Sequence, residues 1–195
     1  MNFTLALATL AFSTIVFADD TFQVRYAANL NIGDSVVDIT NTGATVANNV
    51  SQSLCVNLYT FDPAEELISC CTCTVTPNGL QSLSVLKSLV SNPLTPAIPT
   101  SVVIKAVAST GACNASTVGP RAHGLLMWGT TLHQNTSTAA ASYSVTETPF
   151  AQADLSPAEL AHITSTCGFI QADGSGFGIC KGCAAGGLGA STSNQ

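Results

Sequence analysis

Charge is the scarcest property of this sequence. Charged residues make up 8% of the chain, whereas a typical globular domain has about 25%. The five lysines and arginines are scattered singly, and the formal net charge is −6. Nucleic-acid binding depends on a cationic surface that releases counterions, so this composition argues against a nucleic-acid partner. Disorder is also disfavoured, because disordered chains combine high charge with few apolar residues.

Long hydrophobic runs are missing after the N-terminus. Residues 3–17 form an apolar run that ends at Asp19 and Asp20, shorter than the roughly 20 residues that span a membrane. No basic residue precedes the run, but the small residue Ala18 before the aspartates predicts a signal peptide over residues 1–18. The chain is therefore expected to be secreted, periplasmic or at the cell surface, and not an integral membrane protein.

Cysteine is the residue type that this chain has in unusual number. Its even count in an exported chain favours disulfides over metal-binding or redox thiols. The disulfide candidates are Cys55, Cys70, Cys71, Cys73, Cys113, Cys167, Cys180 and Cys183. Cys180 and Cys183 also have the C-x-x-C spacing of zinc sites and redox dithiols, but an exported chain lacks the reducing surroundings that keep thiols free. We expect no metal and no cofactor.

Short segments rich in branched and aromatic residues alternate with turn signals along most of the chain. They cover residues 22–30, 35–40, 53–61, 67–75, 80–86, 101–108, 124–132 and 142–148. This pattern predicts a mainly β fold, a two-sheet antiparallel β-sandwich of immunoglobulin-like or related type, over residues 19–150.

One hairpin can be predicted in detail. If residues 62–66 form a five-residue loop, Phe61 pairs with Leu67 and Cys55 faces Cys73 on the neighbouring strand. Directly opposed side chains in an antiparallel pair lie close enough for a disulfide to form. We therefore predict a Cys55–Cys73 disulfide.

A helix is predicted after the last strand. Ser156, Pro157 and Glu159 form a capping box with proline at the first helical position, and Gly168 supplies a stop signal. Residues 151–183 are expected to dock on the sandwich as a disulfide-stapled segment with one short α-helix. Its cysteines would pair within the segment or with the sheet near Cys70, Cys71 or Cys113. A flexible tail would follow over residues 184–195.

No set of residues forms a recognisable catalytic motif. The histidines, His123, His133 and His162, have ordinary surface or packing roles as their simplest interpretation. Asp34 and Asp38 offer too few oxygens for a calcium loop, the pair Glu65 and Glu66 falls in the predicted hairpin loop, and Trp128 is expected to fill the core. We therefore assign no catalytic residue.

Several segments, taken together, resemble a family of exported soil-bacterial proteins of unknown function that shares this cysteine framework. They are residues 35–44 (SVVDITNTGA), 66–73 (ELISCCTC), 76–80 (TPNGL), 128–133 (WGTTLH), 167–170 (CGFI) and 174–180 (GSGFGIC). The resemblance implies a destination in the bacterial envelope or outside the cell. It implies no catalytic residues.

Two function classes follow from these observations. The first is a non-enzymatic structural, adhesive or binding protein, whose partner would be another copy of the chain, an envelope or extracellular protein, or a glycan. Low charge, β-rich patterning and the cysteines favour this class. The second is a small secreted hydrolase or metal-dependent enzyme with an unplaced active site. A cleft that gathers His123 or His133 with acids would favour the second class.

Overall fold

The computed structural model describes residues 20–44, 46–47, 50–135, 140 and 142–181. The predicted signal peptide, the predicted tail and Cys183 lie outside these ranges.

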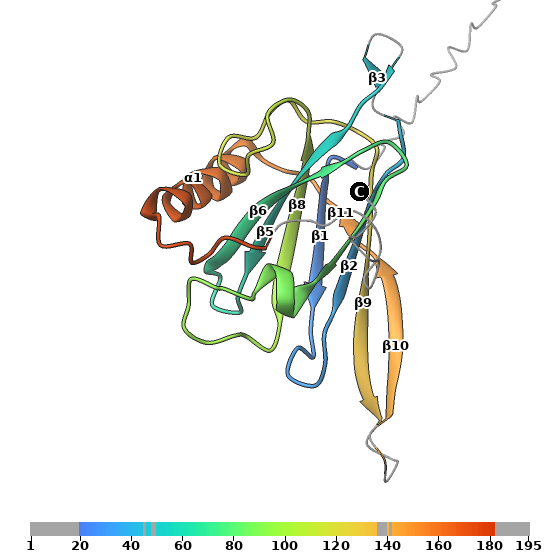
Figure 1. Ribbon diagram of the computed structural model, residues 1–195, viewed down its shortest axis with the longest axis vertical. Coiled ribbons are helices and arrows are strands. Elements are labelled where there is room, and N and C mark those ends of the chain that lie inside the picture. The colour runs from blue at the N-terminus through green and yellow to red at the C-terminus, as the bar shows by residue number, and fades with distance from the viewer. Residues whose placement is uncertain (1–19, 45, 48–49, 136–139, 141, 182–195) are drawn as a thin grey trace, which may run out of the picture.

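Two antiparallel sheets pack face to face, which confirms the predicted sandwich (Figure 1). The five-stranded sheet has the order β11 (Ala151–Gln152), β1 (Phe22–Ala27), β8 (Val102–Ser109), β5 (Leu54–Phe61), β6 (Leu67–Val75). The four-stranded sheet has the order β10 (Ser142–Pro149), β9 (Leu125–Asn135), β2 (Val36–Asn41), β7 (Leu80–Ser84). A small ribbon joins β3 (Val46–Ala47) to β4 (Val50–Ser51), and a π-helical turn, η1 (Val85–Leu89), follows β7. Every predicted strand segment contains a strand, whereas the two-residue strands β3, β4 and β11 were not predicted.

The five-stranded sheet is buried on both of its faces. Strand β5 sends Leu54, Val56 and Leu58 into the core between the sheets, and its alternate residues face the other way, because successive side chains point to opposite faces. Tyr59 lies on that second face in a separate apolar core. Its hydroxyl donates a 2.6 Å hydrogen bond to the carbonyl of Ala115, and burial raises its pKa above the ordinary value.

The second core is closed by the C-terminal helix α1 (Pro157–Asp173), which packs on the outer side of the five-stranded sheet (Figure 1). Ser156 caps this helix by accepting a hydrogen bond from the Glu159 N–H, as predicted. The predicted end at Gly168 is wrong, since the helix continues to a left-handed glycine, Gly174. A glycine inside a helix costs about 1 kcal/mol, whereas the extra turn buries Ile170, which contributes about 1.5–3 kcal/mol. Burial therefore outweighs the stop signal.

The predicted Cys55–Cys73 disulfide is wrong because a β-bulge shifts the register of the hairpin. Phe61 does pair with Leu67, but the next pair is Thr60 with Ser69, so Ile68 is an extra residue on β6. Beyond the bulge Cys55 faces Thr74 and Cys73 faces Val56. One inserted residue turns every following side chain to the opposite face. The sulfur atoms of Cys55 and Cys73 therefore lie on different sides of the sheet.

Three disulfides join six of the seven described cysteines in pairs. They are Cys55–Cys113, Cys70–Cys167 and Cys71–Cys180, with Cα–Cα distances of 5.1, 6.0 and 5.4 Å, all within the usual range for a disulfide. Cys73 is disulfide-bonded as well. The C-terminal segment is thus stapled to the sheet at Cys70 and Cys71, two of the cysteines that the sequence indicated.

After α1 the chain returns along the outer edge of β6. Gly178 has φ of 74°, and a Cβ there would meet the Ile170 side chain at 2.7 Å, so only glycine fits the turn. The Cys70 N–H donates to the Gly178 carbonyl at 2.9 Å, and the Cys180 N–H donates to the Cys70 carbonyl at 3.3 Å. This short pairing covers an edge that would otherwise be open to strand addition.

The Cys55–Cys113 disulfide should be reduced before the Cys70–Cys167 disulfide. Cys113 is exposed, whereas Cys70 and Cys167 are both fully buried. Mild reduction of the folded protein, followed by alkylation and peptide mass spectrometry, should label Cys55 and Cys113 first. Cys70 and Cys167 should be labelled only when the protein is unfolded. Protein that has lost this disulfide should melt at a lower temperature, since loss of a native disulfide costs about 2–5 kcal/mol. Early labelling of Cys167 would contradict the described packing of α1.

Candidate functional site

The three histidines do not gather at one place. His162 is exposed on α1 near the ion pair between Lys105 and Glu159, whose charged atoms lie 2.5 Å apart. His133 is near the far end of β9, where its Nε2 contacts the Thr146 hydroxyl on β10. The part of the chain that the structure describes holds no group of three or more His, Cys, Asp or Glu residues that could bind a metal ion.

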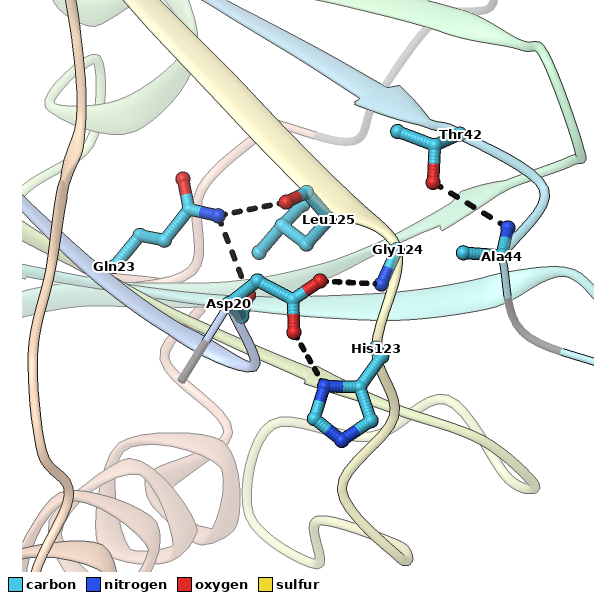
Figure 2. A network of polar contacts seen from close by, with 7 residues as sticks. All are labelled: Asp20, Gln23, Thr42, Ala44, His123, Gly124 and Leu125. Carbon is cyan, nitrogen blue, oxygen red and sulfur yellow. Dashed lines mark hydrogen bonds and ion pairs between the residues drawn. The ribbon is translucent and has the colours of Figure 1, made fainter. Parts of the chain in front are cut away.

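His123 does pair with an acid, but the pair serves as an anchor. Figure 2 shows the carboxylate of Asp20 between the His123 ring and the backbone of Gly124. One oxygen lies 2.5 Å from His123 Nδ1, and the other accepts a 2.8 Å hydrogen bond from the Gly124 N–H. Beside them the Gln23 amide donates to the Leu125 carbonyl at 2.8 Å. These contacts fasten the residues before β1 to the start of β9.

Substitution of Asp20 by alanine should therefore loosen this anchor without unfolding the protein. The His123 side chain is 74% exposed, so the ion pair itself contributes little. The main loss is the oxygen that accepts the Gly124 N–H hydrogen bond, and we expect a fall of about 1 kcal/mol in the free energy of unfolding. Urea denaturation measures it, with Asp20→Asn as the control that keeps an oxygen acceptor. If Asp20→Asn lowers the free energy of unfolding as much as Asp20→Ala does, the charge of Asp20 matters and not the oxygen acceptor alone.

Asp34 and Asp38 have separate structural roles. The Asp34 carboxylate accepts hydrogen bonds from the Leu86 N–H at 3.0 Å and from the Ser84 hydroxyl, at the start of η1. Asp38 accepts from the Ser82 hydroxyl on the neighbouring strand. Glu65 and Glu66 lie in the turn between β5 and β6, as expected. The structure brings none of these acids together at a common cation site.

Trp128 lies on the outer face of the four-stranded sheet, so its predicted place in the core is wrong. Met127 and Leu125 of the same strand point into the core between the sheets, and Trp128 takes the opposite face and is partly exposed. Sequence patterning missed this because apolar residues occupy four consecutive positions of β9. The sequence therefore could not show which residues of β9 face the core and which face solvent.

The strand register places polar side chains around Trp128. Across the sheet, Trp128 lies directly opposite Asp38, and Asp38 lies opposite Ser82. The next row contains Glu147 beside Thr130. Adjacent strands are about 4.8 Å apart and neighbouring rows on one face about 7 Å, so all of these side chains surround one indole ring.

Together these residues line an open groove. Its volume is about 610 Å³, and its lining is Val36, Asp38, Leu80, Ser82, Trp128, Thr130 and Glu147. Two of these lining residues are acidic and none is basic. We call this surface the Trp128 groove. It offers an aromatic ring, apolar neighbours, hydroxyls and two carboxylates within one strip.

Comparisons of the chain with protein-family models, with curated proteins and with solved structures find no match. The described helix is not long and apolar enough to cross a membrane. Three disulfides within a β-sandwich are typical of proteins that work in an oxidising compartment outside the cytoplasm.

Proposed function

We propose that this chain is an extracellular, non-enzymatic binding module that holds a neutral glycan in the Trp128 groove. The observation that carries the proposal is the position of Trp128, partly exposed on an open sheet face and directly opposite Asp38. Exposed apolar patches with polar rims mark interaction sites on soluble proteins.

The chemistry of the groove favours a sugar. A pyranose ring has an apolar face of C–H groups, which stacks on an aromatic ring, and an edge of hydroxyls, which donate to carboxylates. Asp38 and Glu147 supply such acceptors on either side of the indole, and Ser82 and Thr130 supply hydroxyls. The two carboxylates repel acidic polymers, since no basic residue of the described lining offsets them. A neutral sugar can contact the indole ring, the hydroxyls and both carboxylates of the groove, so it is the ligand class that we propose.

The protein carries its own reporter for this site. Trp128 is the single tryptophan of the chain, so its emission reports on the groove alone. Titration with soluble β-1,4-linked oligomers of glucose, xylose or N-acetylglucosamine should change that emission saturably. We expect dissociation constants in the millimolar to micromolar range, a free energy of about −4 to −8 kcal/mol.

Trp128→Ala should abolish this binding when it is measured by calorimetry, because the stacking surface is lost. Trp128→Phe should keep part of the affinity, and Asp38→Asn should weaken it about tenfold, since a charged acceptor is worth about 1.5 kcal/mol or more. Phe169→Ala is the matched control, an aromatic that is 77% exposed on α1. The proposal fails if no neutral oligomer binds, or if Trp128→Ala binds as well as the parent protein.

Self-association through β10 is a second candidate function. Among the described strands this one is at the edge of its sheet and pairs with β9 alone. Nearly all of its residues are exposed, Val145 at 60% and Tyr143 at 47%. An exposed edge strand can accept another strand.

If this edge joins two copies, light scattering should show a mass that rises with concentration. Val145→Lys should restore the monomer, because charged residues on an edge oppose pairing. Val145→Thr, which keeps the β-branched shape, serves as the control. A monomer at every concentration, with glycan binding intact, leaves the Trp128 groove as the functional surface.

A further inference from the structure

A second cavity lies on the opposite side of β9 from the Trp128 groove. It has a volume of about 450 Å³ and opens between β1 and the β9–β10 hairpin, which extends beyond the other strands (Figure 1). Its polar lining includes Arg25, Asn29, Thr131, His133 and Thr146, and Tyr26 is at its rim with 63% of its surface exposed. Cavities of this size hold small molecules.

Strand alternation aims Arg25 into this space. Val24 packs toward α1, so Arg25 points to the other face, between the sheets. The guanidinium crosses directly over Gly129 of β9, where a Cβ would lie 2.1 Å from Arg25 Nε. Glycine at position 129 therefore makes the room that the arginine occupies. Arg25 is only 9% exposed.

The partners of Arg25 are all uncharged. It donates to the Thr148 carbonyl at 2.8 Å, to the Thr148 hydroxyl, and to the Thr131 hydroxyl at 3.0 Å, and it lies 5.9 Å from the ring centre of Phe150. These bonds do not use the Nε–H or one of the two Nη2–H groups. Burial lowers the pKa of Arg25 from its ordinary value, but a guanidinium keeps its charge in proteins.

No acidic residue offsets this charge within the cavity. Of the lining residues that the structure describes, Arg25 and His133 are the basic groups and none is Asp or Glu. A buried charge without a counterion is unfavourable, and it is all the more notable in a chain whose net charge is −6. The charge of this lining therefore favours an anionic ligand.

We propose that this cavity binds a small organic molecule through a carboxylate that pairs with Arg25. The two remaining N–H donors match the two oxygens of a carboxylate, a planar group that arginine binds bidentately. The apolar part of the lining, which includes Ala28 and Pro149, suits an organic body attached to that carboxylate. A single buried arginine does not balance a phosphate dianion, so phosphate is the disfavoured anion.

The test uses the full oxidised chain and three probes. Glucuronate carries a carboxylate on a sugar ring, glucose is its neutral counterpart, and inorganic phosphate is the competing anion. The Arg25 Nε–H resonance should shift saturably with glucuronate at millimolar concentrations, a free energy of about −4 kcal/mol, and should not move with glucose. A stronger response to phosphate would overturn the carboxylate assignment, and no response to glucuronate up to about 50 mM would overturn the site.

Variants separate recognition from packing. Arg25→Lys keeps the charge but loses the fork and should weaken glucuronate binding about tenfold, and Arg25→Gln should weaken it further. Gly129→Ala keeps the arginine at position 25, but the added Cβ displaces its guanidinium. This variant should therefore also lose glucuronate binding. Trp128→Ala should bind glucuronate normally, since Trp128 lies on the other face of β9. The wild-type resonance shift remains decisive if an Arg25 variant fails to fold, and Gly129→Ala with unchanged affinity would contradict the proposed geometry.

Discussion

Two adjacent cysteines on β6 hold the C-terminal part of the chain on both faces of one strand. Neighbouring residues of a strand point in opposite directions, so Cys70 reaches α1 through Cys167 while Cys71 reaches the core between the sheets through Cys180. The helix is thereby held over one face of the five-stranded sheet. The returning chain is held along the edge of β6. The second apolar core, with Tyr59 at its centre, depends on this arrangement.

These two disulfides also determine which sheet face remains exposed to solvent. With α1 on one side and the four-stranded sheet on the other, the five-stranded sheet has both faces covered. The four-stranded sheet has a core only on its inner side, and its outer side carries Trp128, Asp38 and Glu147. Antiparallel sheets commonly leave one face to solvent with polar residues on it. A partly exposed tryptophan among these polar residues is the departure from that rule, and it is why the groove carries the functional proposal.

The sequence predicted the elements better than their register. Turn residues and branched segments located the main strands, and the capping box at Ser156 located the helix. All residues of β5 are buried, because both faces of its sheet are covered. Its polar residues Asn57 and Thr60 are buried like the apolar ones, so polarity marks no solvent-facing side that would fix the pairing. The bulge at Ile68 therefore left no signal in the sequence. Trp128 was misplaced for a related reason, within the run of apolar residues at the start of β9.

Scarcity of charge makes the two proposed sites separable. Strand β9 sends Trp128 and Thr130 outward and Gly129 and Thr131 inward, so one strand forms a wall of both sites. The Trp128 groove is acidic and the cavity that holds Arg25 is basic. Because the chain has few charged residues, the electrostatic potential of each site is set mainly by its own lining. A neutral hydroxylated ligand suits the first and a carboxylate suits the second. Because each preference rests on one or two side chains, a single substitution can remove one site and leave the other, which a surface built from many charges would not allow.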